Sequence, residues 1–129
     1  MVVLTVMNNE NQIANGAGNQ LKGSKGPNIY GGLSPKELLE GAVALCLSMT
    51  LEKVLERDEV EVNFDELIIN VQASKRNGVE NRFSDFNVEV TFPSSLEPKY
   101  KQKLLKVIER GCTISNTLTN DVDVFIKEK

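Results

Sequence analysis

The segment GGLSPKELLEGAVALCLSMTLEKVLER, residues 31–57, constrains the fold more than any other part of the sequence. Ser34 is a suitable helix cap, Pro35 suits the first helical position, and Glu37 completes a capping box. The sequence therefore predicts a helix over residues 34–57, which would be ~30 Å long at the standard rise per residue. Apolar residues fall on nearly every face of this helix, which indicates that it packs on several sides.

Composition and charge limit the class of protein. The chain has 129 residues, a formal net charge of -3 and 40% hydrophobic residues, and we expect a single domain over residues 1–129. A mildly acidic chain offers no general basic surface for nucleic acid. The longest apolar run is too short to span a bilayer, and the first residues lack the basic stretch of a signal peptide. We therefore expect a cytoplasmic protein with neither a nucleic-acid nor a membrane partner.

The rest of the sequence predicts a mixture of strands and helices. Residues 1–33 begin with MVVLTVM, which favours a strand, and continue as a glycine-rich arm. Residues 60–129 predict a hairpin of two alternating strands and then a second helix with a glycine cap at Gly111. A short helix and a final strand over DVDVFIKEK complete the chain. This order predicts the α+β fold class.

The sequence contains no histidine and two cysteines. The absence of histidine excludes Ser-His-Asp and Cys-His nucleophile systems and the usual zinc sites. Cys46 and Cys112 form no CxxC pair, so we expect neither a metal nor another cofactor. Any chemistry must come from cysteine, carboxylate, lysine, arginine, tyrosine or backbone groups.

The two cysteines have different settings. Cys46 lies in the middle of the long predicted helix, where a free cysteine often serves as a small core residue. Cys112 follows Gly111 at the predicted start of the short helix, where unpaired backbone N–H groups would favour the thiolate. A structural role and a redox role are both open for each residue. The sequence does not show whether the two sulfurs meet, and a disulfide would require Cα atoms within ~7 Å.

Three segments resemble the OsmC/Ohr family, and specifically its general OsmC-like branch. SPKELLEGAVALCLSMTL, residues 34–51, resembles the family's central helix with its cysteine. GCTISNTL, residues 111–118, is similar to the second cysteine motif, and RFSDFNVEV, residues 82–90, is similar to the strand between the helices. The resemblance covers roughly residues 28–129.

The resemblance implies an OsmC-like fold in which long central helices are wrapped by antiparallel sheets in an intertwined homodimer. It also implies a thiol-dependent peroxidase that reduces organic hydroperoxides in defence against oxidative stress. In that reading Cys46 attacks the peroxide, Cys112 resolves the resulting sulfenic acid, and a small or protein dithiol reductant reopens the disulfide. Glu37 is the candidate for the acid that activates the thiol.

The sequence also departs from the pattern of the family's peroxidases. In those peroxidases the residue after the helix proline is a glutamate, which pairs with an amino-terminal arginine. In this sequence Lys36 follows Pro35, and the acid Glu37 comes one position later, which is a rotation of ~100° around the helix. Arg57 is the first arginine in the chain. These departures keep a second hypothesis open: a non-catalytic OsmC-like dimer that binds an apolar ligand or acts as a thiol redox sensor.

Overall fold

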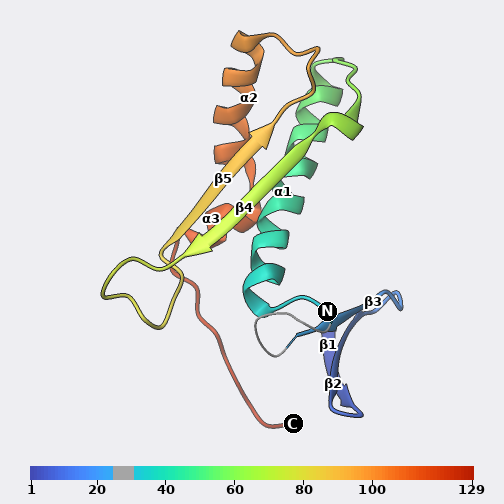
Figure 1. The fold of residues 1–129 in the computed structure, drawn as a ribbon, viewed down its shortest axis with the longest axis vertical. Helices are drawn as coiled ribbons and strands as arrows, with labels where there is room; N and C mark the ends of the chain where they lie inside the picture. The colour runs from blue at the N-terminus through green and yellow to red at the C-terminus, as the bar shows by residue number, and fades with distance from the viewer. Residues whose placement is uncertain (25–30) are drawn as a thin grey trace. The chain divides into compact units, whose positions relative to one another are not determined.

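The computed structural model describes residues 1–24 and 31–129, which form two compact units, Met1–Gly41 and Ala42–Lys129. The first unit contains β1 (Val2–Met7), β2 (Glu10–Asn15) and β3 (Gln20–Gly23). Helix α1 (Pro35–Arg57) begins in the first unit and continues through the second, which then adds η1 (Phe64–Glu66), β4 (Ile68–Ser74), β5 (Asp85–Thr91), α2 (Pro98–Gly111) and α3 (Thr113–Leu118) (Figure 1). Residues 25–30 of the predicted glycine-rich arm lie outside the described residues.

The first unit is built on an antiparallel sheet with the strand order β1-β2-β3. The predicted first strand is present, and the glycine-rich region contributes two further strands. Asn8 and Asn9 join β1 to β2 with φ values of 50° and 63°, a conformation that asparagine tolerates in tight hairpin turns. The chain returns to β3 at Leu33, whose N–H donates to the Lys22 carbonyl at 2.9 Å. Gly32 makes this approach possible, because a Cβ there would lie 2.6 Å from the same carbonyl oxygen.

Helix α1 begins as predicted. The Ser34 backbone N–H donates to Glu37 Oε1 at 3.0 Å, and the Glu37 N–H donates to Ser34 Oγ at 3.2 Å, which together form the expected capping box. In the second unit one face of the helix is buried, through Val43, Leu47, Leu51, Val54 and Leu55. Leu45 and Met49, elsewhere on the helix, are 64% and 49% exposed. The apolar residues therefore do extend beyond the face that packs within this chain.

The second unit packs helices against a hairpin. Strands β4 and β5 pair antiparallel with Val71 opposite Val88, and Figure 1 shows the hairpin running beside α1 and α2. The alternating residues Ile69, Val71, Phe86 and Val90 pack against a core that α1 shares with Leu104 and Ile108 of α2. These alternating residues therefore form the inward face of the hairpin, which packs on the core that α1 and α2 share.

Two predicted strands differ from the structure. The strand predicted from residue 60 begins only at Ile68, because Asn63 accepts a hydrogen bond from the Asp65 N–H at 3.1 Å and supports the turn of η1. The final strand predicted over DVDVFIKEK is not formed; residues 121–129 lie in no strand of this chain. A strand needs a neighbouring edge for its hydrogen bonds, and this segment has none within the described residues. No helix in residues 1–24 and 31–129 is long and apolar enough to cross a membrane.

Candidate active site

Cys46 lies on the half-buried side of α1. It packs against the core of the second unit between the buried residues Val43 and Leu47. One turn later, Thr50 donates its hydroxyl to the Cys46 carbonyl at 2.9 Å, which uses that hydroxyl within the helix. Cys46 therefore combines a fixed backbone position with a side chain that solvent or a small reactant can still reach.

Cys112 lies at the junction of two helices. It is the C-cap of α2 and the N-cap of α3, in extended backbone with φ -84° and ψ 113°. Its sulfur accepts a hydrogen bond from the Ser115 backbone N–H at 3.4 Å, in the position that a serine or aspartate side chain takes in a typical N-cap. The residue is fully buried, with 0% exposure. The junction between α2 and α3, together with this hydrogen bond, thus fixes the position of the Cys112 sulfur.

Gly111 explains how this junction comes so close to α1. A Cβ on Gly111 would lie 3.1 Å from Cγ2 of Thr50, so a larger residue would press against the turn that follows Cys46. The prediction that Gly111 caps α2 is wrong, since the helix runs through Gly111 and is capped by Cys112. The glycine allows the close packing of the two helices, and its backbone is not left-handed.

Cys112 lies in the hydrophobic core of the second unit, Cys46 packs against the same core, and both are free thiols. Burial alone would raise the pKa of Cys112, but hydrogen bonds from the Cys46 thiol, the Ser115 hydroxyl and the N–H groups of Ser115 and Ile114 outweigh it and hold the pKa below its ordinary value. The prediction of a favoured thiolate at Cys112 is therefore confirmed. None of these groups in the described part of the chain is a cation.

Glu37 belongs to the first unit. Hydrogen bonds from the Ser34 backbone N–H and hydroxyl hold the pKa of Glu37 below its ordinary value, so the carboxylate is charged at neutral pH. The structure gives this carboxylate the role of a helix cap at the start of α1.

The second unit contains a cavity of about 570 Å³ whose lining includes neither cysteine; its volume is within the size range of small-molecule sites. Val43 and Leu47, the neighbours of Cys46 on α1, line it, and so does Ser115, the hydrogen-bond donor to Cys112. The other lining residues come from β5 and the residues before it, from α2 and from α3: Arg82, Phe83, Ser84, Phe86, Val88, Val90, Leu105, Ile108, Glu109, Leu118 and Thr119. Most are apolar, with charge provided by Arg82 and Glu109.

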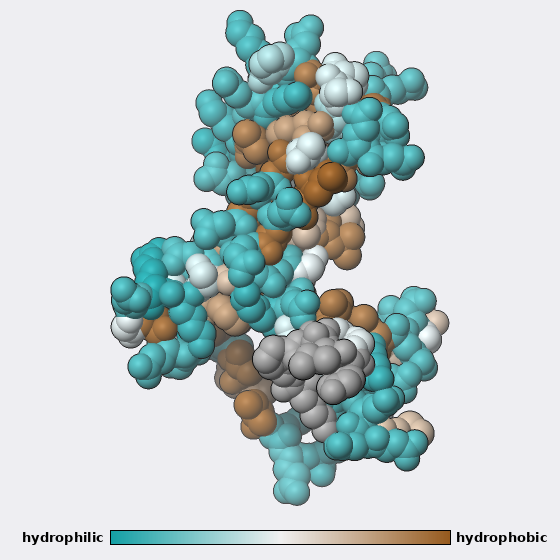
Figure 2. Space-filling model, viewed as in Figure 1, coloured by the Kyte–Doolittle hydropathy of each residue, from teal (hydrophilic) through white to brown (hydrophobic). Residues whose placement is uncertain are grey.

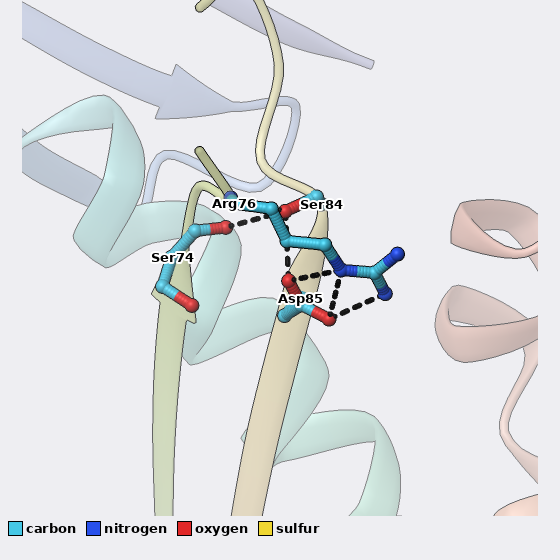
Figure 3. A network of polar contacts seen from close by, with 4 residues as sticks. All are labelled: Ser74, Arg76, Ser84 and Asp85. Atoms are coloured by element: carbon cyan, nitrogen blue, oxygen red, sulfur yellow. Dashed lines mark hydrogen bonds and ion pairs between the residues drawn. The ribbon is translucent and has the colours of Figure 1, made fainter. Parts of the chain in front are cut away.

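A polar network holds the hairpin end that forms one wall of the cavity (Figure 3). Arg76 donates to Asp85 through Nε at 2.9 Å and Nη2 at 2.7 Å, and the Ser84 hydroxyl donates to the same carboxylate at 2.7 Å. The Ser84 N–H also donates to the Ser74 carbonyl at 2.9 Å. The Arg76 guanidinium, then Ser84, hold the pKa of Asp85 below its ordinary value. This network fixes Ser84 where the chain enters β5 along the cavity.

Residues 25–127 match the OsmC-like protein family. This chain belongs to the OsmC-like family. The match covers both cysteine motifs, and it confirms the resemblance found in the sequence. A comparison with curated proteins gives no match.

Solved structures of OsmC-like proteins share the fold. An OsmC-like protein from Mycoplasma pneumoniae superposes with a TM-score of 0.78 at 14% identity, covering 92% of this chain and 86% of that chain. The organic hydroperoxide resistance protein OhrB of Bacillus subtilis gives 0.66 at 20% identity, covering 95% and 93%. The organic hydroperoxide resistance protein OsmC from Legionella pneumophila gives 0.67 at 15% identity, covering 95% and 92%. These likenesses establish a mixed α+β, OsmC-like architecture.

Sequence reasoning on this OsmC-like chain missed the residues that position Cys112. Ser115 stands three places after Cys112, the spacing at which an N-cap side chain meets a backbone N–H, and that spacing could have identified it. Thr50 and Gly111 meet across 61 positions of sequence, and neither position carries a local signal of their contact.

Proposed function

We propose that this OsmC-like protein is a cysteine-based, thiol-dependent peroxidase that reduces organic hydroperoxides, as a homodimer in the cytoplasm. The observation that carries the proposal is that two free thiols pack in one core, next to residues that line a largely apolar cavity: Val43 and Leu47 on α1, and Ser115, whose N–H donates to the Cys112 sulfur. Unpaired cysteines suit a reducing compartment. The names of the relatives OhrB and the Legionella protein, both organic hydroperoxide resistance proteins, agree with this substrate class.

Cys46 is the proposed peroxidatic residue because its side chain is only partly buried, whereas Cys112 is fully buried. The Cys46 thiolate attacks the distal peroxide oxygen, the O–O bond breaks, and the products are a sulfenic acid and an alkoxide that is protonated to the alcohol. The Cys112 thiolate then attacks the Cys46 sulfur and displaces hydroxide, which leaves a disulfide. A dithiol reductant reopens that disulfide by exchange.

The cavity supports an organic rather than an inorganic peroxide. Phe86, Val90 and Leu118 line it and can cover the hydrocarbon part of a substrate, which removes apolar surface from water. Hydrogen peroxide has no such part and gains nothing from these contacts. We therefore expect cumene hydroperoxide to be consumed faster than hydrogen peroxide at equal concentration.

The homodimer is supported by apolar surface that this chain does not cover. On β1, Val2, Val3 and Leu4 are 64%, 52% and 57% exposed, so both faces of that strand are open. Phe125 and Ile126 near the carboxyl end are 90% and 92% exposed, and Figure 2 shows hydrophobic side chains open among the hydrophilic surface. Exposed apolar surface on this scale is typical of a protein–protein contact.

Consumption of cumene hydroperoxide with excess dithiothreitol tests the proposal. Wild-type protein should consume peroxide catalytically, and Cys46→Ser should lose nearly all of that activity. Cys112→Ser should form a sulfenic acid at Cys46, detected with dimedone, but no intramolecular disulfide. Equal consumption by wild type and Cys46→Ser would rule out Cys46 as the nucleophile.

The proposed function keeps Glu37 as the candidate acid that activates the thiol. The substitution Glu37→Gln distinguishes this catalytic role from the role of Glu37 in the helix cap. Glutamine also completes a capping box but carries no charge. A slower Glu37→Gln enzyme of unchanged stability would support a catalytic part for the carboxylate. Full activity would limit Glu37 to the helix cap.

The cavity also favours a second candidate function, the non-catalytic binding of an apolar ligand with the thiols serving as a redox sensor. This function predicts that peroxide forms the Cys46–Cys112 disulfide once, without sustained turnover under excess dithiothreitol. Sustained turnover would exclude it.

A further inference from the structure

Helix α2 carries a row of cations on its outer face. Lys99, Lys103, Lys106 and Arg110 follow one another at intervals of four, three and four residues, and all four are exposed. At ~100° per residue these positions fall within a sector of ~60° around the helix, and the row is ~16 Å long at the standard rise. These four residues are called the α2 basic stripe below.

The stripe points away from the core of the second unit. The buried residues of α2 are Leu104 and Ile108, which lie on the opposite side of the helix. Among the described residues, Lys103 is the member of the stripe that has a salt bridge, at 3.5 Å to Asp58. The other three cations of the stripe therefore remain available to a partner.

The stripe is a local feature of a chain whose net charge is -3. At physiological ionic strength, exposed charges more than ~8 Å apart are largely screened from one another. A partner that reaches the stripe therefore meets its cations rather than the net charge of the chain. Within Pro98–Gly111 the single acidic residue is Glu109, on the flank beside Lys106. The outer face of α2 is thus suited to an anionic surface.

The same flank of α2 borders the apolar cavity. Leu105 of α2 and Leu118 of α3 line the cavity and are 45% and 39% exposed, so the cavity opens to solvent beside α2. Cations next to exposed leucines match the chemistry of a bilayer surface, where anionic headgroups lie over hydrocarbon.

The stripe is less suited to nucleic acid. Proteins that bind single strands combine cations with aromatic side chains on which bases stack. The aromatic residue of α2 is Tyr100, which is half-buried and donates its hydroxyl to Asp58 Oδ2 at 2.8 Å. The observations therefore favour a lipid surface.

We propose that the α2 basic stripe docks this protein on an anionic lipid surface. Four or more lysines and arginines on an amphipathic helix are typical of such binding, and each cation near the surface raises the affinity about fivefold. A contact of this kind needs no segment that crosses the bilayer, and the short apolar run of the sequence excludes only a spanning segment. The docking surface goes beyond the proposed peroxidase function and does not depend on it.

Co-sedimentation of the reduced, full-length protein with large vesicles tests the proposal. At about 0.1 M NaCl, wild type should pellet with phosphatidylcholine vesicles that contain about one-third phosphatidylglycerol. It should stay in the supernatant with phosphatidylcholine alone. Raising the salt to about 1 M shortens the screening length to ~3 Å and should release the protein. Equal binding to both kinds of vesicle, or binding to neither, would overturn the proposal.

A double variant tests whether the stripe is the part of the surface that binds. Lys99→Gln with Lys106→Gln removes two cations, keeps good helix formers and leaves Lys103 in contact with Asp58. The partition coefficient on the anionic vesicles should fall about 25-fold, while far-UV circular dichroism should be unchanged.

The matched control removes the same charge elsewhere. Lys53→Gln with Lys129→Gln changes two exposed lysines outside the stripe and should bind the anionic vesicles like wild type. An equal loss of binding in both double variants would show that net charge alone governs the contact, and would overturn the stripe as the docking surface.

A fluorescent single-stranded deoxythymidine oligonucleotide separates lipid from nucleic acid as the partner. Its fluorescence anisotropy should not change at protein concentrations that saturate the anionic vesicles. Tight oligonucleotide binding that is lost in Lys99→Gln with Lys106→Gln would assign the stripe to nucleic acid and overturn docking on lipid. None of these assays contains peroxide, so their outcome is independent of the proposed peroxidase activity.

Discussion

At the scale of single residues, the missing methyl group of Gly111 allows the carboxyl end of α2 to approach α1 closely. Gly111 lies at the carboxyl end of α2, and its Cα approaches Thr50 on α1 so closely that an added Cβ would be 3.1 Å from Cγ2. Thr50 is one turn from Cys46, and Gly111 is next to Cys112. The contact therefore lies close in sequence to both cysteines, although neither Gly111 nor Thr50 carries the chemistry.

Gly111→Ala should slow formation of the Cys46–Cys112 disulfide several-fold while changing stability little. The alanine gains up to ~1 kcal/mol of helix propensity, and the contact with Thr50 offsets that gain. The rate of disulfide formation after a pulse of peroxide, followed by mass spectrometry, measures the first effect. Urea unfolding of the reduced protein measures the second.

Thr50→Ser provides the matched rescue for this substitution, because it removes Cγ2 and keeps the hydroxyl that donates to Cys46. The double variant Thr50→Ser, Gly111→Ala should therefore form the disulfide as rapidly as wild type, and α2 should be more stable than in wild type. A double variant as slow as Gly111→Ala alone would show that the contact does not set the approach of the sulfurs.

At the scale of elements, the far end of the α1–α2 pair is joined by polar contacts. Tyr100 of α2 donates its hydroxyl to Asp58 Oδ2 at 2.8 Å, just after α1 ends, and Lys103 lies 3.5 Å from the same oxygen. The Tyr100 hydrogen bond is the main reason that the pKa of Asp58 is below its ordinary value. Burial, then the bond to Asp58, raises the pKa of Tyr100 to about 12.

Tyr100→Phe should therefore destabilise the protein in a pH-dependent way. The lowered pKa of Asp58 contributes stability above the ordinary aspartate pKa of ~3.9, which is lost as pH falls through the lower folded value. The raised pKa of Tyr100 contributes below ~10 and is lost as pH rises through about 12. Thermal unfolding midpoints should thus differ most near neutral pH and converge in acid. A constant difference from pH 3 to 8 would contradict the coupling.

The sequence predicted those elements whose signals are local. The capping box of Ser34 and Glu37 and the alternation of Ile69, Val71 and Phe86 all have the predicted structure. The glycine at 111 was misread, because a left-handed cap and a close helix contact use the same residue for different reasons. The packing of Cys46 and Cys112 in one core could be suggested only by resemblance, since it depends on the tertiary packing of α2 against α1.

At the scale of the whole molecule, the chain leaves the apolar surfaces of its two ends without cover. Residues 121–129 have the alternating pattern of a strand but no neighbouring strand within the described chain. Val124, Phe125 and Ile126 are 79%, 90% and 92% exposed. An unpaired segment of this kind is a ready site for pairing with another chain, which is the physical basis for the proposed homodimer.

Charge on this segment should therefore break the dimer. The double substitution Phe125→Asp and Ile126→Asp places two carboxylates where apolar side chains would be buried, and burying an unpaired charge is strongly unfavourable. Sedimentation velocity should give twice the chain mass of 14.3 kDa for wild type and a single chain for the variant. Lys127→Glu is the matched control, because it changes charge on the same exposed segment but removes no apolar side chain, and it should still form dimers. A monomeric wild type, or a double variant that dimerises normally, would show that the segment has another purpose.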